Sequence, residues 1–238
     1  MADTLVFLPA WNEEDSVAVV LGELRAGLPD ADVLVVDDGS SDRTAAVARE
    51  HGADVVCFGE NRGVRAAIAE GYRQALERGY AYVGRVDADG QHPVAELRRL
   101  LELVRSGGCD VAIGSRFVSG DGYSAYRYAP SGPRRVGTAL LRRAMRLALG
   151  RPFADATSGL VAASARALPL LAQRYTSGAP EVEALLRLHE AGLRVAEVPV
   201  DMRERASGES KLRGSKAVEL VLTAAGTLLL FRLARRRR

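Results

Sequence analysis

The chain of 238 residues has only two cysteines, Cys57 and Cys109, which excludes a disulfide-stapled scaffold and the cysteine-rich zinc modules. Its first residues, M-A-D-T-L, carry neither a basic stretch nor a long hydrophobic run, so we expect no secretory signal peptide. The low cysteine count favours a reducing, cytosolic setting. The composition, 47% hydrophobic and 26% charged, is typical of a folded domain and excludes a disordered tail or a membrane bundle.

Several common ligand-binding motifs are also missing. No G-x-G-x-x-G follows the first predicted strand and no G-x-x-x-x-G-K-[ST] occurs, which excludes the dinucleotide-binding turn and the P-loop. No H-E-x-x-H and no paired Cys/His spacing indicates a zinc site. The histidines His51, His92 and His189 are scattered, and we interpret them as structural.

Positive charge is concentrated in two segments. The formal net charge is +3, but Arg232 and Arg235–Arg238 lie in the last seven residues, so the rest of the chain is slightly acidic. This distribution argues against nucleic-acid binding. Between Gly122 and Ala154 the chain has arginines but no acidic residue, which favours an anionic binding partner for this segment.

Short hydrophobic runs alternate with helical patterns, which predicts a layered α/β domain. The predicted strands are Thr4–Pro9, Asp32–Asp37, Asp54–Phe58, Tyr80–Val86, Asp110–Gly114 and Leu193–Val198. The predicted helices are Glu13–Ala26, a segment from a Ser41 N-cap to His51, Val64–Arg78, Pro93–Arg105, Arg134–Leu149 and Glu181–Ala191. Polar loops are expected over Ser119–Pro133 and Ala206–Gly214.

Three polar clusters follow predicted strands: Trp11–Glu13, Asp37–Ser40 and Asp87–Gln91. Ligands of open α/β sheets bind beyond the carboxyl ends of the strands, so we expect the clusters to share one site. Each cluster alone is also an ordinary turn sequence, but three at one edge, carrying carboxylates, favour a site. Asp87 and Asp89 are spaced so that both can reach one Mg²⁺ or Mn²⁺, and the amide of Gln91 can add a ligand.

A series of motifs resembles, in order, those of family 2 glycosyltransferases. They are L-P-A-W-N-E-E, V-V-D-D-G-S-S-D-R-T, N-R-G-V-R-A-A-I-A-E-G, D-A-D-G-Q-H-P, I-G-S-R-F, D-A-T-S-G and E-V-P-V-D-M-R-E-R-A-S-G-E-S-K-L. The resemblance extends over about residues 4–212 and includes the polyprenol- and dolichol-phosphate mannose and glucose synthases and their bacterial relatives. It implies a GT-A fold, a Rossmann-like α/β/α sandwich with a mostly parallel mixed sheet. We therefore expect a glycosyltransferase domain over 1–212 and a C-terminal helix with a basic tail over 213–238.

The resemblance also implies roles for individual residues. The expected metal ligands are Asp87, Asp89 and Gln91. The expected catalytic residues are Asp89, Arg116, Glu181 and Glu183. The residues expected to bind the nucleotide-diphospho-sugar or close over its diphosphate are Pro9, Trp11, Glu13, Asp38, Gly63, Arg65, Asp87, Arg203, Arg205, Ser210 and Lys211.

Two departures from the family pattern stand out. Trp11 replaces the usual tyrosine of the first motif, and an indole can still stack on a base. After D-A-T-S-G the family has an aromatic residue and an arginine, whereas this chain has Leu160 and Val161. Any phosphate or acceptor contact that the arginine makes in relatives is therefore missing.

The resemblance implies a metal-dependent, inverting transfer of a hexose from a GDP- or UDP-linked donor to a polyprenyl phosphate. A phosphate acceptor is already ionised at neutral pH and needs no strong base. If a hydroxyl of a glycan or small aglycone accepts the sugar instead, Glu181 or Glu183 is the expected base. The two acids are also explained by the preference of a helix N-terminus for negative charge. A third alternative is a non-catalytic nucleotide-sugar-binding or scaffold protein, against which the intact D-x-D argues.

The C-terminal segment Lys216–Ala234 has the pattern of a helix with a narrow polar stripe. Its hydrophobic part, Ala217–Phe231, would span roughly 22 Å as a helix, short of the roughly 30 Å hydrocarbon core. We interpret residues 217–238 as lying on the inner face of the membrane, with the arginines on anionic headgroups, or as docking to a small membrane protein. The alternative is a helix packed on its own domain. The expected location is cytoplasmic and peripheral to the membrane.

Overall fold

The structure, a computed structural model, describes residues 2–120 and 153–203, together with residues 143, 145, 146, 149, 150 and 226. The strands are β1 (Thr4–Ala10), β2 (Asp32–Asp37), β3 (Asp54–Cys57), β4 (Tyr82–Arg85), β5 (Val111–Ser115), β6 (Val161–Ser164) and β7 (Val195–Pro199). The helices are α1 (Glu14–Gly27), α2 (Thr44–Glu50), α3 (Val64–Glu77), α4 (Val94–Arg105), α6 (Leu168–Leu171) and α7 (Pro180–Glu190).

The strands form one sheet in the order β3-β2-β1-β4-β6-β5-β7. β6 runs antiparallel to both β4 and β5, whereas the other pairs are parallel. The predicted mostly parallel mixed sheet is therefore confirmed. The sequence patterns missed β6 and the short helix α6 that follows it.

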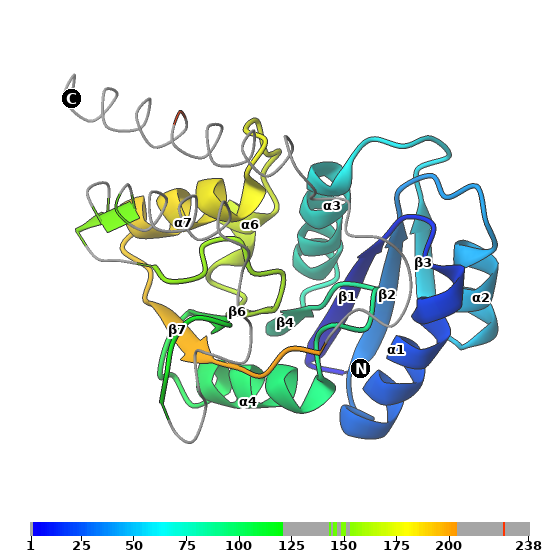
Figure 1. The fold of residues 1–238 in the computed structure, drawn as a ribbon, viewed down its shortest axis with the longest axis horizontal. Coiled ribbons are helices and arrows are strands. Elements are labelled where there is room, and N and C mark those ends of the chain that lie inside the picture. Colours follow the sequence, from blue (N-terminus) through cyan, green and yellow to red (C-terminus); the bar gives the residue numbers. More distant parts are fainter. Residues whose placement is uncertain are drawn as a thin grey trace.

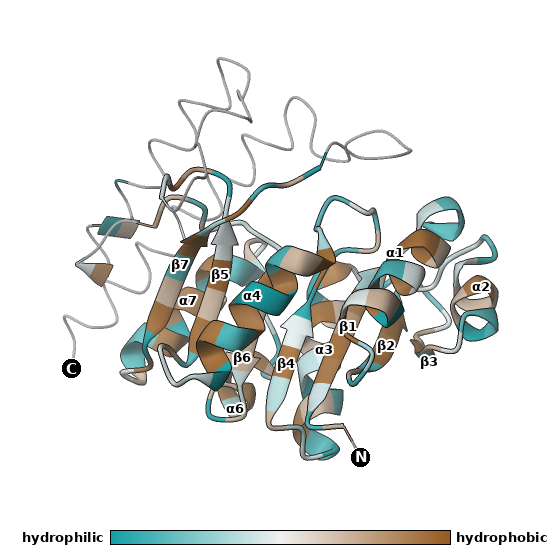
Figure 2. Ribbon diagram, turned by 90° about the horizontal axis from the view of Figure 1, so that it is seen from below, coloured by the Kyte–Doolittle hydropathy of each residue, from teal (hydrophilic) through white to brown (hydrophobic). Residues whose placement is uncertain are grey.

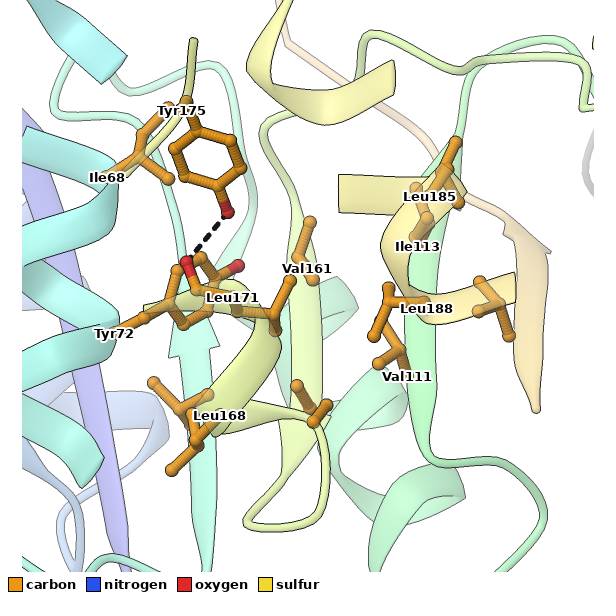
Figure 3. Packing of buried hydrophobic residues seen from close by; sticks show 14 of the residues in the cluster. Ile68, Tyr72, Val111, Ile113, Val161, Leu168, Leu171, Tyr175, Leu185 and Leu188 are labelled. Atoms are coloured by element: carbon orange, nitrogen blue, oxygen red, sulfur yellow. Dashed lines mark hydrogen bonds between the residues drawn. The ribbon is translucent and has the colours of Figure 1, made fainter. Parts of the chain in front are cut away.

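Helices cover both faces of the sheet (Figures 1 and 2). The buried hydrophobic residues form two clusters, to which successive residues of a strand contribute alternately. On β1, Leu5 and Phe7 belong to the cluster that includes residues of α3, α6 and α7, while Val6 and Leu8 belong to the cluster that includes residues of α1 and α4. Figure 3 shows the first of these clusters. Because helices cover both faces, the strands read as continuous hydrophobic runs, and the predicted α/β/α sandwich is confirmed.

Some expectations differ from the structure or lie outside it. α2 begins at Thr44 after Arg43, without a side-chain cap, so the predicted Ser41 N-cap is wrong. The backbone N–H and hydroxyl of Ser41 instead donate to Oδ1 of Asn12. Most of the predicted 134–149 helix, the 206–214 loop and the 213–238 segment lie outside the described residues. Within the part of the chain that the structure describes, no helix combines the length and hydrophobicity needed to cross a membrane.

Candidate active site

The loops that follow β1 and β2 are joined by hydrogen bonds between side chains and backbone. The Asn12 N–H donates to Oγ of Ser40 at 2.9 Å, and the Glu13 N–H donates to Oγ1 of Thr44 at 2.8 Å. Asn12 has φ 53°, and among the described residues it is the only non-glycine residue with a positive φ. A non-glycine residue in this region stores strain that the surrounding contacts must hold. The predicted nucleotide residues Trp11 and Glu13 therefore sit on a fixed loop.

Asp38 links the loop after β2 to the start of α3. Its backbone N–H donates to the Ala10 carbonyl at 2.9 Å, and its Oδ1 accepts the Arg62 N–H at 2.7 Å. Burial raises the pKa of Asp38, although hydrogen bonds from the Arg62 and Gly63 N–H groups act in the opposite direction. Gly39 adopts φ 69°, and a Cβ there would meet the Glu60 backbone at 2.3 Å. The loops after β1, β2 and β3 thus meet around Asp38.

The segment after β4 turns tightly so that two carboxylates lie close together in the chain. Oδ1 of Asp89 accepts the Gln91 N–H at 3.1 Å, and Asp89 is buried, whereas the side chain of Asp87 is 38% exposed. The Asp87 N–H donates to Nδ1 of His92 at 3.0 Å, which places the proton of a neutral ring on Nε2, 4.0 Å from Oδ2 of Asp87. Burial lowers the pKa of His92, consistent with this neutral ring.

These residues fit a small divalent cation. Within the described residues no group of three His, Cys, Asp or Glu side chains could hold a metal, so Asp87 and Asp89 do not form a closed protein cage. Mg²⁺ and Mn²⁺ prefer such a set, in which one or two carboxylates leave positions for water and phosphate oxygens. Gly159 lies against Asp87, and the absence of a Cβ there leaves room for the Asp87 carboxylate.

Gly159→Ala is expected to weaken Mn²⁺ binding by about tenfold or more, as is typical for residues that orient metal ligands. An added Cβ would lie 2.5 Å from Oδ2 and 2.7 Å from Oδ1 of Asp87, so the carboxylate must move. Calorimetric titration with Mn²⁺ measures the effect. Gly22→Ala, at a helical position with nothing within 4 Å of the added Cβ, is the matched control. Equal affinity of both variants would contradict this reading of Gly159.

Arg116, predicted on the substrate side, lies just after β5 and is paired with a buried carboxylate. Its Nε and Nη2 donate to Oδ2 and Oδ1 of Asp155 at 2.7 and 2.8 Å. The Ala154 and Asp155 N–H groups donate to the carboxylate of Glu197 on β7 at 2.8 and 2.6 Å. Arg116 thereby fixes the D-A-T-S-G loop, which carries Gly159 to Asp87.

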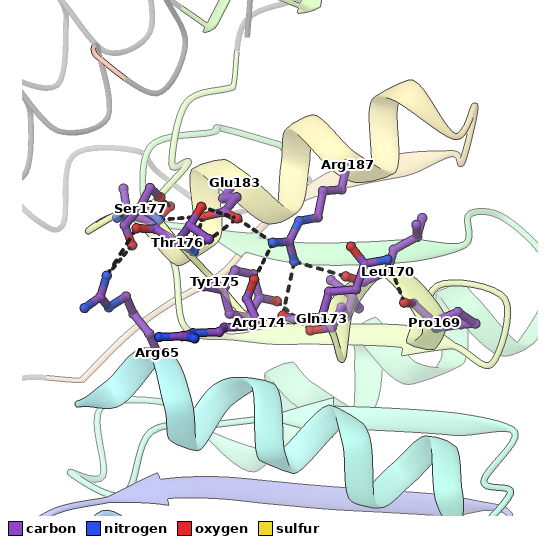
Figure 4. Close-up of polar contacts among 12 residues, drawn as sticks. Arg65, Pro169, Leu170, Gln173, Arg174, Tyr175, Thr176, Ser177, Glu183 and Arg187 are labelled. Carbon is purple, nitrogen blue, oxygen red and sulfur yellow. Dashed lines mark hydrogen bonds and ion pairs between the residues drawn. The ribbon is translucent and has the colours of Figure 1, made fainter. Parts of the chain in front are cut away.

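The two candidate bases on α7 point to different places. Glu181 Oε1 lies 3.0 Å from Nη2 of Arg85, next to the Asp87 end of the site. Glu183 turns away: its carboxylate accepts the N–H groups of Thr176 and Ser177, at 3.0 and 2.8 Å to Oε2, and pairs with Arg187 (Figure 4). Burial alone would raise the pKa of Glu183, but these hydrogen bonds and Arg187 outweigh it and lower the pKa. The structure brings Glu181 to the site and gives Glu183 a role in holding the 174–177 segment.

The remaining predicted residues have other partners or lie outside the described chain. Arg65 Nη1 donates to the Ser177 carbonyl at 3.1 Å, so it joins the start of α3 to the segment before α7 (Figure 4). Arg203 pairs with Glu23 of α1 at 2.5 Å, while its N–H donates to the Gln91 carbonyl at 2.9 Å. Pro9 lies in β1, where it pairs in register with Val36. The residues outside the described chain are Arg205, Ser210 and Lys211.

The sequence patterns did not identify Arg85, Asp155 or Gly159 as parts of this edge. Arg85 was detectable in principle, because it is a charged residue inside an otherwise hydrophobic strand. Asp155 and Gly159 belong to the D-A-T-S-G motif, but only the folded chain shows what they contact.

The comparisons with known proteins agree with this geometry. Residues 5–165 match the family model for glycosyl transferase family 2. The chain is 36% identical over 228 residues to the undecaprenyl-phosphate mannosyltransferase of Micrococcus luteus. The matched region covers 92% of this chain and 90% of that protein. It is 34% identical over 231 residues to the polyprenol monophosphomannose synthase of Mycolicibacterium smegmatis, covering 93% of this chain and 85% of that protein.

A solved structure shows the same fold. Glucosyl-3-phosphoglycerate synthase from Mycobacterium tuberculosis, crystallised with Mn²⁺ and uridine-diphosphate-glucose, superposes with a TM-score of 0.65 at 23% identity, covering 94% of this chain and 79% of that one. The predicted GT-A fold is therefore confirmed. Since the family model covers more than half of the chain and full-length relatives exceed 30% identity, the chain belongs to glycosyl transferase family 2 and is a glycosyltransferase.

Proposed function

We propose that this glycosyltransferase moves a hexose, mannose in the first instance, from a nucleoside-diphospho-sugar to a polyprenyl phosphate. The observation that carries the proposal is the pair of carboxylates after β4, Asp89 buried and Asp87 half-exposed, in a chain whose full-length relatives are named for this transfer. GDP- and UDP-linked donors both fall within the proposal.

The reaction is a single displacement. An oxygen of the acceptor phosphate attacks the anomeric carbon, the bond from that carbon to the donor diphosphate breaks, and the nucleoside diphosphate leaves with inversion at the carbon. Because a phosphate monoester is largely dianionic at neutral pH, with a second pKa of about 6, no protein group has to remove a proton. The loops around Asp38 and Trp11 bind the nucleotide end of the donor and orient the sugar for attack.

Asp87, Asp89 and Gln91 would hold the divalent cation, Mg²⁺ or Mn²⁺. When bound, the cation neutralises the charge that develops on the departing diphosphate. The Mn²⁺ in the M. tuberculosis structure of the same fold supports this assignment. We place Asp38, Gly63, Trp11 and Glu13 at the base and ribose, and the following residues at the diphosphate: Arg65, Arg203, Arg205, Ser210 and Lys211.

The contacts of the two glutamates favour a phosphate acceptor over a hydroxyl. A hydroxyl acceptor requires a base within hydrogen-bond reach, and Glu181 and Glu183 were the sequence-based candidates. Glu181 is engaged by Arg85, and Glu183 binds Thr176, Ser177 and Arg187. Both carboxylates therefore already have hydrogen-bonding partners.

An acceptor panel tests the proposal. Wild-type protein receives radiolabelled nucleoside-diphospho-mannose, Mn²⁺ and one of three acceptors in detergent: polyprenyl phosphate, the matching polyprenol, or a soluble saccharide. We expect label in the lipid fraction with polyprenyl phosphate and not with polyprenol. Transfer to polyprenol or to the saccharide at an equal rate would contradict the proposal and favour the hydroxyl acceptor.

We also propose that residues 217–238 hold the 1–212 domain at a membrane surface. This proposal is supported by the hydrophobic stretch 217–231, which the arginine tail follows, and by the lipid acceptors named for the relatives. Deleting 217–238 is expected to abolish sedimentation with anionic vesicles. It should lower transfer to polyprenyl phosphate in liposomes far more than hydrolysis of the donor, because the deletion leaves the donor site unchanged.

Salt provides the control for this membrane prediction. Attraction between the arginines and anionic headgroups acts within a Debye length of about 8 Å at physiological ionic strength, so added salt should release the full-length protein from the vesicles. Equal sedimentation of full-length and truncated protein would remove the membrane-surface proposal.

A further inference from the structure

Arg85 is a buried charge at the end of β4. The residue is 5% exposed and lines a mainly hydrophobic cavity between α3, the sheet and α7, together with Ile68 and Leu185. Tyr72, which Figure 3 shows projecting into this layer from α3, lines the same cavity. A guanidinium buried in such surroundings is strongly unfavourable unless nearby negative charges compensate it.

One guanidinium nitrogen of Arg85 lies between two carboxylates. Nη2 is 3.0 Å from Oε1 of Glu181 and 3.6 Å from Oδ1 of Asp87. Nε of Arg85 is buried and has no hydrogen-bond partner among the described residues, so these two carboxylates supply the main charge compensation. Without the Arg85 guanidinium between them, Glu181 and Asp87 would be neighbouring like charges, which repel.

We propose that Arg85 is a positioning residue that separates Glu181 from Asp87 and so sets how strongly the Asp87–Asp89 site attracts a divalent cation. Glu181 is the counter-ion of Arg85 and not a proton acceptor. The inference rests on the proposed function only in taking Asp87 as a metal ligand. Arg85 divides its attraction between Glu181 and Asp87. A substitution of Arg85 or of Glu181 therefore changes how strongly the Asp87 carboxylate attracts the metal.

The charge balance predicts opposite effects for the two single substitutions. In Glu181→Gln, Arg85 keeps only Asp87 as an anionic partner, competes with the cation for it, and Mn²⁺ binding weakens. In Arg85→Met, the competing guanidinium is gone and Glu181 adds an uncompensated negative charge beside Asp87, so Mn²⁺ binding strengthens. In the double variant Arg85→Met/Glu181→Leu both charges leave together, and the affinity returns toward the wild-type value.

Titration of the protein with Mn²⁺ alone tests the proposal, with free Mn²⁺ followed by electron paramagnetic resonance. We expect a weakening of about threefold or more in Glu181→Gln, a strengthening of similar size in Arg85→Met, and a double variant within about twofold of wild type. Glu190→Gln, an exposed residue at the other end of α7, is the matched control and should leave the affinity unchanged. Shifts of the same sign in both single variants, no shift, or no Mn²⁺ binding by the wild type would overturn the proposal.

Turnover and folding separate this proposal from its alternatives. If Glu181 is a base, Glu181→Gln loses turnover with an unchanged Mn²⁺ affinity, and the double variant is no better. Thermal denaturation checks that each variant is folded; if Arg85→Met is not, Arg85→Lys replaces it and should leave Mn²⁺ binding closer to wild type than Glu181→Gln does. The Mn²⁺ shifts do not depend on the acceptor, so they can hold even if transfer to polyprenyl phosphate fails, and they can fail when that transfer is observed.

Discussion

Asp89→Asn is expected to lower the rate of sugar transfer by about 100-fold or more while the protein stays folded. Asp89 is buried after β4, and its Oδ1 accepts the Gln91 N–H at 3.1 Å. Asparagine has the same size, and its carbonyl oxygen can keep that hydrogen bond. The substitution therefore removes mainly a negative charge from the proposed cation site. Initial rates at saturating donor and acceptor measure the consequence.

Two further measurements make this prediction specific to the metal site. Asp30→Asn changes an exposed carboxylate outside the site and should keep full activity. Treatment of the wild type with EDTA should reproduce the loss, and added Mn²⁺ or Mg²⁺ should restore the rate. Full activity of Asp89→Asn, or of the wild type in EDTA, would refute the metal assignment.

Arg116→Met is expected to destabilise the fold by about 3–5 kcal/mol, because it leaves the buried Asp155 carboxylate without its ionic partner. The side chain of Asp155 is 1% exposed and receives two guanidinium hydrogen bonds from Arg116. For a chain of this size the loss corresponds to a drop of roughly 10 °C in the melting temperature. Transfer should also fall, since the loop that Arg116 fixes carries Gly159 to Asp87.

A second arginine–aspartate pair provides the control. Arg166 pairs with Asp110, but its side chain is 70% exposed, and Asp110 also accepts the Arg194 N–H at 2.8 Å. Arg166→Met should therefore cost only about 0–1 kcal/mol. Equal melting temperatures for the two variants would show that the Arg116–Asp155 pair contributes no more than an exposed pair.

Local patterns predicted the strands that bury their own hydrophobic runs. V-L-V-V between Asp32 and Asp37 predicted β2 with its observed bounds, and the pattern over 64–78 predicted α3, which ends at Glu77. The strand β6, with the sequence V-A-A-S, was missed because its residues are small and its formation depends on antiparallel pairing with β4 and β5. Ser41 failed as a cap because Asn12, distant in sequence, offered its side chain a different partner.

In the site, too, local sequence predicted the position of residues but not their contacts with distant parts of the chain. The polar clusters were placed correctly at the strand ends, because each follows a hydrophobic run directly in the sequence. Their partners could not be predicted, since Arg85 and Glu181 are 96 residues apart and Arg116 and Asp155 are 39 apart. Glu181 and Glu183 looked equivalent in the sequence, but residues two apart on a helix point roughly 200° apart, so only one of them faces Arg85.

The most direct test of the proposed reaction is ³¹P NMR of one mixture containing the protein, Mg²⁺, nucleoside-diphospho-mannose and a short-chain polyprenyl phosphate. The account predicts that the phosphate monoester signal of the lipid falls at the same rate as a phosphodiester signal and the signals of free nucleoside diphosphate rise. Release of nucleoside diphosphate with an unchanged lipid monoester signal would contradict it, because the sugar would then have gone to water or to a hydroxyl.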